Sequence, residues 1–129
     1  MEENKLTSIR PFLTVVDGKK AVEFYMAAFG AREIERFEIG AGKISSVLEI
    51  ATARFFVADE EPANGNFAPV PGAINSIRMI LETRNADALF VSAIESGAKE
   101  ICPMTTEADW RIGKLTDPFG HTWELGYPL

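Results

Sequence analysis

The segment LTDPFGHTWELGYPL at the end of the sequence holds the only histidine, His121, three residues before the carboxylate of Glu124. Histidine and glutamate are common ligands of divalent metals, so the pair raises the question of a metal site. In a regular strand, however, residues three positions apart point to opposite faces of the sheet. His121 and Glu124 can then bind one ion only if the strand begins after His121 or contains a bulge. We expect His121 to complete the DPFGH turn instead.

Composition and charge narrow the classes of function. The chain has 129 residues, of which 47% are hydrophobic and 25% charged, and this fits one globular domain over 1–129. The net charge of −6 and the lack of a basic run argue against nucleic acid and anionic membranes as partners. No apolar stretch approaches the roughly 18 residues that a membrane helix needs. The single cysteine rules out an intrachain disulfide and, with an N-terminal segment that lacks an apolar core, favours a cytoplasmic location.

The elements that must position these side chains begin with a strand over 9–17. It is rich in β-branched and aromatic residues and ends at the Asp17-Gly18 turn. A helix over 19–30 follows, with Asp17 as its N-cap and Gly30 as the residue that ends it. Further strands are predicted at 32–40 and, around a tight turn near 51–53, within 43–60.

The same pattern restarts after a segment rich in proline, glycine and asparagine. Residues 60–74 of this segment form the one obvious linker. Beyond it we predict a strand at 74–82 and a helix at 85–97, with apolar residues on one face of the helix. Three further strands are predicted at 98–104, 110–117 and 121–127.

The two halves align at an offset of 67 residues, with AVEFYMAAFGARE (21–33) over ALFVSAIESGAKE (88–100). The shared order of elements indicates an internal βαβββ duplication. We therefore predict an α+β fold of two tandem modules, at about 8–59 and about 75–129, that form an open, barrel-like mixed sheet with the helices on the outside. The alternative is two ordinary βα units that are in phase by chance.

The offset also predicts which side chains share a cavity. Alternation along the last strand places Trp123 under the helix and Thr122 and Glu124 on the other face. The offset matches Glu124 with Val57 in the first module. On this reasoning Phe55 and Val57 lie on the same inner face as Glu124.

Two segments and the paired βαβββ order make the chain resemble the vicinal oxygen chelate superfamily. The segments are DPFGHTWEL and VVDGKKAVEFYMAAFGA. That superfamily includes glyoxalase I, bleomycin-resistance proteins, fosfomycin-resistance enzymes and extradiol dioxygenases. RPFLTVVD, FFVADE and WRIGKLTDPFGHTWE resemble its PhnB-like, glyoxalase/bleomycin-resistance branch. The resemblance covers nearly the whole chain and implies a homodimer in which facing modules complete each cavity, but it is weakly specific for an activity.

Metal-binding members of that superfamily use four ligand positions, two in each module. Carried over to this chain, the positions fall on Arg10, Val57, Ser76 and Glu124, and only Glu124 keeps a usual ligand. A divalent ion needs three or four N, O or S donors. One carboxylate and one hydroxyl are too few, so we expect a site without a metal or another cofactor. The resemblance still keeps open a metal-dependent glyoxalase-like lyase, isomerase or dioxygenase.

Without a metal, arginine side chains become the candidates for holding a ligand. Arg10 is expected to pair with Glu124 or to grip an anionic part of a ligand, because a guanidinium group suits carboxylates and phosphates. Arg78 lies two residues beyond Ser76, so we expect it on the same inner face. The predicted ligand-binding residues are Arg10, Phe12, Phe55, Val57, Ser76, Arg78, Thr122 and Glu124. The alternatives are that both arginines lie on an exposed rim and that Glu124 forms a cross-strand salt bridge.

These residues support three hypotheses. The chain is a metal-free module that binds a small hydrophobic or partly anionic molecule, or it is a metal-dependent enzyme of the superfamily. The third hypothesis is a metal-independent enzyme with Glu124, the only catalytic candidate, as general base. Metal content separates the second hypothesis from the other two, and turnover of a bound ligand separates the third from the first.

Overall fold

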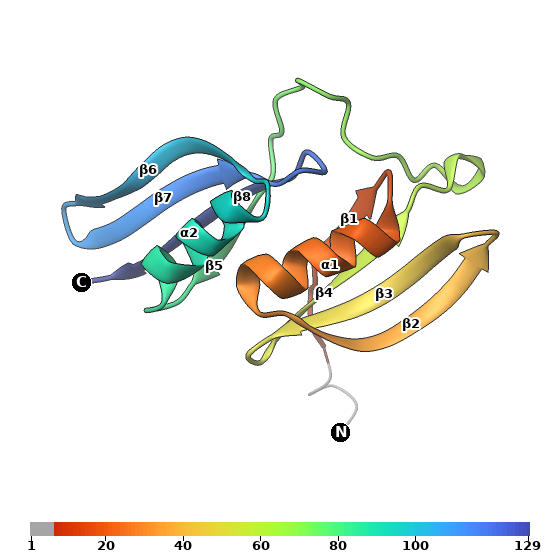
Figure 1. The fold of residues 1–129 in the computed structure, drawn as a ribbon, viewed down its shortest axis with the longest axis horizontal. Coiled ribbons are helices and arrows are strands. Elements are labelled where there is room, and N and C mark those ends of the chain that lie inside the picture. Colours follow the sequence, from red (N-terminus) through yellow and green to blue (C-terminus); the bar gives the residue numbers. More distant parts are fainter. Residues whose placement is uncertain (1–6) are drawn as a thin grey trace.

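The computed structural model describes residues 7–129, which form two βαβββ modules in tandem (Figure 1). Module one comprises β1 (Phe12–Val15), α1 (Gly18–Phe29), β2 (Arg32–Gly40), β3 (Lys43–Ile50) and β4 (Ala53–Asp59). Module two comprises β5 (Arg78–Glu82), α2 (Ala86–Glu95), β6 (Lys99–Glu107), β7 (Trp110–Thr116) and β8 (Thr122–Pro128). The connecting segment contains one short 3-10 helix, η2 (Pro62–Asn64). This order confirms the predicted α+β fold of two tandem modules.

Each module builds its own four-stranded mixed sheet. The strand order is β1-β4-β3-β2 in module one and β5-β8-β7-β6 in module two. The pairs β1–β4 and β5–β8 are parallel, and the other pairs are antiparallel. Within the described part of the chain no strand pair joins the two sheets, so they do not close into a barrel. As a result, β1 and β5 each keep one edge that no strand of the described residues adjoins.

The two helices begin differently. Asp17 is the N-cap of α1, where its side chain accepts a hydrogen bond from the Lys20 backbone N–H at 3.1 Å. Gly30 ends α1 in a left-handed conformation with a φ of 68°. Both predicted ends of this helix are therefore confirmed. In α2 the Asn85 side chain makes no capping hydrogen bond, so α2 depends more on its packing than on its cap.

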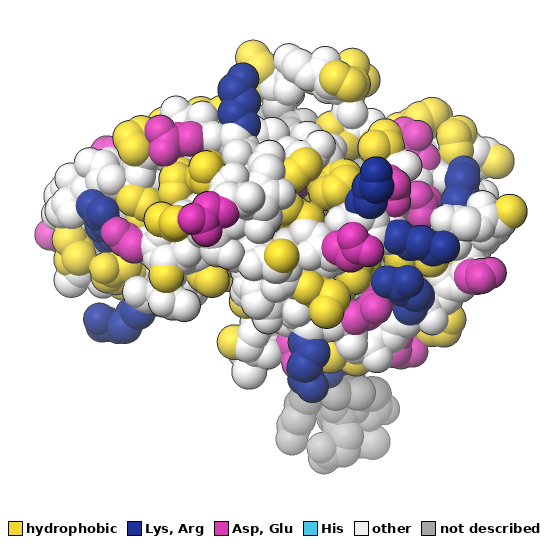
Figure 2. All heavy atoms as spheres, in the orientation of Figure 1, with side chains coloured by type: hydrophobic (Ala, Val, Ile, Leu, Met, Phe, Trp, Pro, Cys, Tyr) yellow, Lys and Arg dark blue, Asp and Glu magenta, His cyan; other side chains and the backbone are white. Residues whose placement is uncertain are grey.

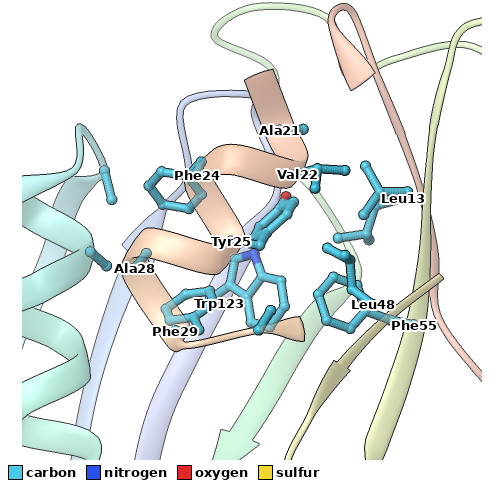
Figure 3. Close-up of a cluster of buried hydrophobic side chains, with 14 of the residues drawn as sticks. Leu13, Ala21, Val22, Phe24, Tyr25, Ala28, Phe29, Leu48, Phe55 and Trp123 are labelled. Atoms are coloured by element: carbon cyan, nitrogen blue, oxygen red, sulfur yellow. The ribbon is translucent and has the colours of Figure 1, made fainter. Parts of the chain in front are cut away.

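Aromatic side chains from both modules meet in one hydrophobic core (Figure 3). Phe24, Tyr25 and Phe29 of α1 lie with Phe55 of β4 and Trp123 of β8. The centroid of the Trp123 ring is 4.8 Å from that of Phe29, 5.6 Å from that of Tyr25 and 5.7 Å from that of Phe55. Because Trp123 belongs to module two and all three of these ring partners to module one, this cluster joins the modules.

A buried carboxylate links the modules at the DPFGH turn. Asp117 Oδ2 accepts hydrogen bonds from the Tyr25 hydroxyl and, at 3.0 Å, from the Trp123 indole N–H. Its Oδ1 accepts from two backbone N–H groups of the turn, and the one from His121 lies at 3.0 Å. The His121 Nε2 atom lies 2.8 Å from the Thr14 carbonyl oxygen of β1. His121 therefore completes the turn, as predicted, and also contacts module one.

The face that carries the helices has a mixed charge (Figure 2). Lysine and arginine side chains alternate with aspartate and glutamate there and form no large patch of one sign. The helices α1 and α2 have 12 and 10 residues, fewer than the roughly 20 that cross a bilayer. Among residues 7–129, no helix is long and apolar enough to span a membrane.

Candidate functional site

Glu124 lies in β8 on the sheet face that the helices leave uncovered, and only 8% of its surface is exposed. It forms an ion pair with Arg78 of β5, and Lys114 Nζ of β7 lies 3.8 Å from the same carboxylate oxygen. Glu124 and Lys114 border a groove of about 210 Å³. The predicted alternative of a cross-strand salt bridge is therefore confirmed. Among the residues that the structure describes, no ion pair joins Arg10 to Glu124.

A cavity of about 710 Å³ lies between the modules, and we call it the intermodule cleft. Residues 77–81, which include most of β5, border it from module two. Residues 8–11 and the turn between β3 and β4 border it from module one. The core residues Phe55 and Trp123 also reach it. The outline of the molecule is indented between the two modules (Figure 2).

Three arginines line the intermodule cleft: Arg10, Arg54 and Arg78. No aspartate or glutamate among the described residues lines it, and most of its other side chains are apolar. The chain as a whole has 19 acidic and only 13 basic residues, so this cavity reverses the overall charge. An apolar lining with a few polar groups is the usual composition of a small-molecule site.

The three guanidinium groups differ in their protein partners. Arg54 Nε donates a hydrogen bond to Glu49 at 3.0 Å, and Arg32 donates to the same carboxylate at 2.5 Å. Hydrogen bonds from Arg32 and then from Arg54 lower the pKa of Glu49. Arg78 holds the ion pair described above. Arg10 is exposed and forms no ion pair within residues 7–129, so its positive charge is available to a ligand.

The other predicted site residues on the uncovered side of the molecule border different spaces. Phe12 is the first residue of β1, and 54% of its surface is exposed. Phe12 and Ser76 line a second cavity of about 350 Å³ that adjoins the intermodule cleft. Thr122 lies opposite Arg78 in the register of β5 and β8. The structure thus divides the predicted residues among separate spaces instead of one common cavity.

Two predicted site residues face the core. Phe55 and Val57 are 4% and 0% exposed, and the Phe55 ring packs against α1. The expectation that they share a face with Glu124 is therefore wrong, although Phe55 reaches the edge of the intermodule cleft. The residue between them, Phe56, lies on the uncovered face and stacks on Phe12 with 5.5 Å between ring centroids. The sequence analysis did not place Phe56 on this face.

One extra residue before β8 explains this error. The antiparallel registers pair Leu48 with Phe55 in module one and Leu115 with Trp123 in module two. Leu48 and Leu115 are 67 positions apart, but Phe55 and Trp123 are 68 apart. The segment between the paired residues is thus one residue longer in module two (116–122) than in module one (49–54). A shift of one residue exchanges the two faces of a strand, so the predicted facing of β4 was reversed.

This register moves the ligand position on Val57 to Phe56, and counting from the N-cap of α2 moves the one on Ser76 to Arg78. The four positions implied by the resemblance then fall on Arg10, Phe56, Arg78 and Glu124. Arg10 and Arg78 each lie seven residues before the N-cap of their helix, which makes them counterparts. Only Glu124 is a usual metal ligand, and it is paired with a cation. Residues 7–129 hold no group of three or more His, Cys, Asp or Glu side chains that could bind an ion. The donor set does not fit a divalent metal.

Known proteins share both sequence and fold with this chain. The family model of the Glyoxalase/Bleomycin resistance protein/Dioxygenase superfamily matches residues 6–125. An uncharacterised protein of Mycobacterium tuberculosis is 31% identical over 135 residues, which cover 100% of this chain and 79% of the relative. The X-ray structure of an Arabidopsis thaliana gene product is 31% identical, with a TM-score of 0.72, over 93% of this chain and 98% of that one.

A more distant structure is that of a mutant of the fosfomycin resistance protein FosX from Listeria monocytogenes, complexed with Mn(II) and 1S,2S-dihydroxypropylphosphonic acid. Its TM-score is 0.69 at 16% identity, over 93% of this chain and 88% of that one. At this level of identity the likeness extends to the fold alone.

Proposed function

Because the chain belongs to the Glyoxalase/Bleomycin resistance protein/Dioxygenase superfamily, we propose that it binds a small, partly hydrophobic and anionic molecule in the intermodule cleft. The proposal assigns binding without a divalent metal. It assigns no reaction, because Glu124, the only catalytic candidate, already holds an ion pair with Arg78.

The free guanidinium group of Arg10 is the observation that carries this proposal. Arg10 borders a largely apolar cavity and has no ion-pair partner among residues 7–129. A charged group beside apolar surface is strongest as a binding group where water is partly excluded. The volume of about 710 Å³ lies in the range of roughly 300–1,000 Å³ that is usual for small-molecule sites.

A hydrophobic anion whose fluorescence rises on binding tests the proposal directly. Anilinonaphthalene sulfonate is expected to bind the folded protein, and Arg10→Ala is expected to weaken that binding by about tenfold, the effect of one charge-assisted contact. Arg84→Ala is the matched control, because it removes the same exposed charge outside the cleft. Equal binding by the Arg10→Ala variant and the wild type would reject the proposed site.

Metal independence needs its own measurement. Protein purified without chelator or affinity tag is expected to contain far less than one metal per chain. Nickel, zinc, cobalt, manganese and iron(II) are expected to leave its melting temperature unchanged, because Arg78 occupies the one carboxylate of the site. Near-stoichiometric metal, or stabilisation that Glu124→Ala abolishes, would instead support the metal-dependent lyase, isomerase or dioxygenase of the superfamily.

Association of two chains is part of the same proposal. Phe12, Phe37 and Ile80 are 54%, 56% and 56% exposed, and large apolar side chains on open sheet faces are typical of interaction surfaces. We expect a homodimer, which light scattering would detect as about twice the chain mass of 14.2 kDa. A mass equal to that of one chain would reject the homodimer.

The cellular location and the branch within the superfamily stay predictions. Cys102 is exposed and free, as is usual for a protein in a reducing compartment. Cell fractionation that finds the protein outside the cytoplasm would contradict the proposed location. The PhnB-like branch rests on the resemblance of the quoted segments.

A further inference from the structure

We infer that the intermodule cleft selects a ligand whose anionic group is compact and doubly charged, such as a phosphate monoester or a phosphonate, attached to an apolar body. This inference rests on the proposed function and adds the charge of the ligand to it.

The charges around the cleft leave a positive excess at each of its arginines. Arg54 shares the carboxylate of Glu49 with Arg32, so two cations are compensated by one anion. Arg10 has no ion-pair partner among the described residues. No carboxylate of the described chain lines the cleft itself, so this local excess is not cancelled there.

The third arginine follows the same pattern. Arg78 shares the carboxylate of Glu124 with Lys114, which again leaves one positive charge uncompensated. A singly charged ligand would neutralise one of these three excess charges and leave the others to repel each other. A doubly charged ligand neutralises two of them and so removes more of this repulsion. The charge count therefore favours a dianion.

The chemistry of arginine indicates the shape of this anionic group. A guanidinium group is a planar fork of N–H donors that matches two oxygens of a phosphate or carboxylate. A phosphoryl group offers three terminal oxygens on one atom, so more than one guanidinium group can contact it at once. The apolar lining, which includes Ile77 and Ile80, then accommodates the body of the ligand.

Two probes with the same body separate charge from shape. Phenyl phosphate is doubly charged at about pH 8, because its second pKa is near 6, and phenyl sulfate carries one charge at that pH. Calorimetric titration of the whole protein at low salt is expected to give a dissociation constant at least about tenfold lower for phenyl phosphate. Added salt is expected to reduce this preference, because it screens exposed charges. Inorganic phosphate, which lacks the apolar body, is expected to bind more weakly than phenyl phosphate.

Variants link the preference to named charges. Arg10→Ala is expected to weaken phenyl phosphate binding by about tenfold, and Arg54→Ala provides a second removal of charge from the cleft. Glu49→Gln removes the carboxylate that compensates Arg54 and is expected to tighten binding by about threefold. Arg84→Ala is expected to leave binding unchanged, and circular dichroism checks that each variant is folded.

The outcomes distinguish this inference from the function on which it rests. If phenyl sulfate binds as tightly as phenyl phosphate, the dianion preference is wrong and the binding of a hydrophobic anion still stands. If inorganic phosphate binds as tightly as phenyl phosphate, the inference that the ligand carries an apolar body is wrong. If neither phenyl compound nor anilinonaphthalene sulfonate binds, the proposed function fails as well. If Arg84→Ala weakens binding as much as Arg10→Ala, the charge effect does not come from the cleft.

Discussion

Asp117 is the residue on which the junction between the modules depends most. It is 4% exposed, and each of its two carboxylate oxygens accepts two hydrogen bonds. Two of the donors are buried side-chain groups, the Tyr25 hydroxyl and the Trp123 indole N–H. A buried donor that loses its acceptor costs its full desolvation penalty, so this carboxylate stabilises four groups at once.

The substitution Asp117→Asn tests this role with little change in volume. It replaces one acceptor oxygen by an NH₂ group, which would face two donors instead of accepting from them. We expect the free energy of unfolding to fall by about 3 kcal/mol or more. Urea denaturation measures this loss, and Asp109→Asn, at an exposed position, is the control that should change it by less than about 0.5 kcal/mol. Similar losses in the two variants would contradict the role assigned to Asp117.

Tyr25 gives the junction a dependence on alkaline pH. Burial, and then the nearby charge of Asp117, raise the pKa of Tyr25 well above its usual value. In the unfolded chain the tyrosine hydroxyl has its ordinary pKa of about 10. Above that pH the unfolded state loses a proton that the folded state keeps, so the free energy of unfolding must fall as the pH rises.

The Tyr25→Phe substitution isolates this contribution. At neutral pH we expect the variant to be less stable by about 1–3 kcal/mol, because Asp117 loses one donor. Above about pH 10 the difference in the free energy of unfolding between the wild type and the variant should shrink, since only the wild type has the Tyr25 hydroxyl that titrates. Urea denaturation from pH 7 to about pH 11 measures both curves. Parallel curves over this range would show that Tyr25 is not linked to the alkaline loss of stability.

At the scale of single elements, the two helices should respond differently to loss of their N-cap side chains. The Asp17 side chain accepts a capping hydrogen bond, whereas the Asn85 side chain makes none. We expect Asp17→Ala to lower the melting temperature by the equivalent of about 1 kcal/mol. Asn85→Ala should cost much less, because it removes no capping bond. Equal shifts in the two variants would contradict the difference between the caps.

The elements themselves were predictable because local patterns specify them. Asp17 and Gly30 mark the ends of α1, and β2 covers 32–40 as predicted. The facing of β4 was not predictable from the same patterns. Phe55, Phe56 and Val57 are all apolar, so alternation of polar and apolar residues gives no signal there. The predicted facing of β4 therefore rested on the alignment of the two helices. One extra residue before β8 was enough to reverse that facing.

The candidate site was predictable in its residue types but not in its pairs. The ligand positions implied by the resemblance identified Arg10, and strand spacing from Ser76 identified Arg78. Which cation Glu124 binds depends on the neighbours of β8 in the sheet, and strand order brings β5 and β7 to its two sides. Arg54 was missed because it is a single charge at the start of a strand. Only the packing of the two modules places it in the cleft with the other arginines.

At the scale of the whole molecule, the modules are joined through their interiors, and within residues 7–129 they share no strand pair. Trp123 lies among the aromatic side chains of α1, and Ser92 Oγ of α2 donates a hydrogen bond to the Ala27 carbonyl of α1 at 2.9 Å. Removal of either module would therefore expose part of the other module's core. The sequence repeat indicates two modules, but it carries no signal for this packing, which comes from residues that differ between the halves.

This shared core leads to a last prediction, that the two modules unfold together. Urea unfolding followed by tryptophan fluorescence and by far-ultraviolet circular dichroism should give one coincident transition. The Trp110→Phe variant leaves Trp123 as the only tryptophan, so its fluorescence reports the junction alone. If the modules were independent, fluorescence and circular dichroism would give separate midpoints. Loss of the Trp123 contacts removes a packing partner of α1 and one of the four hydrogen-bond donors to Asp117, so neither module keeps its core once the junction opens.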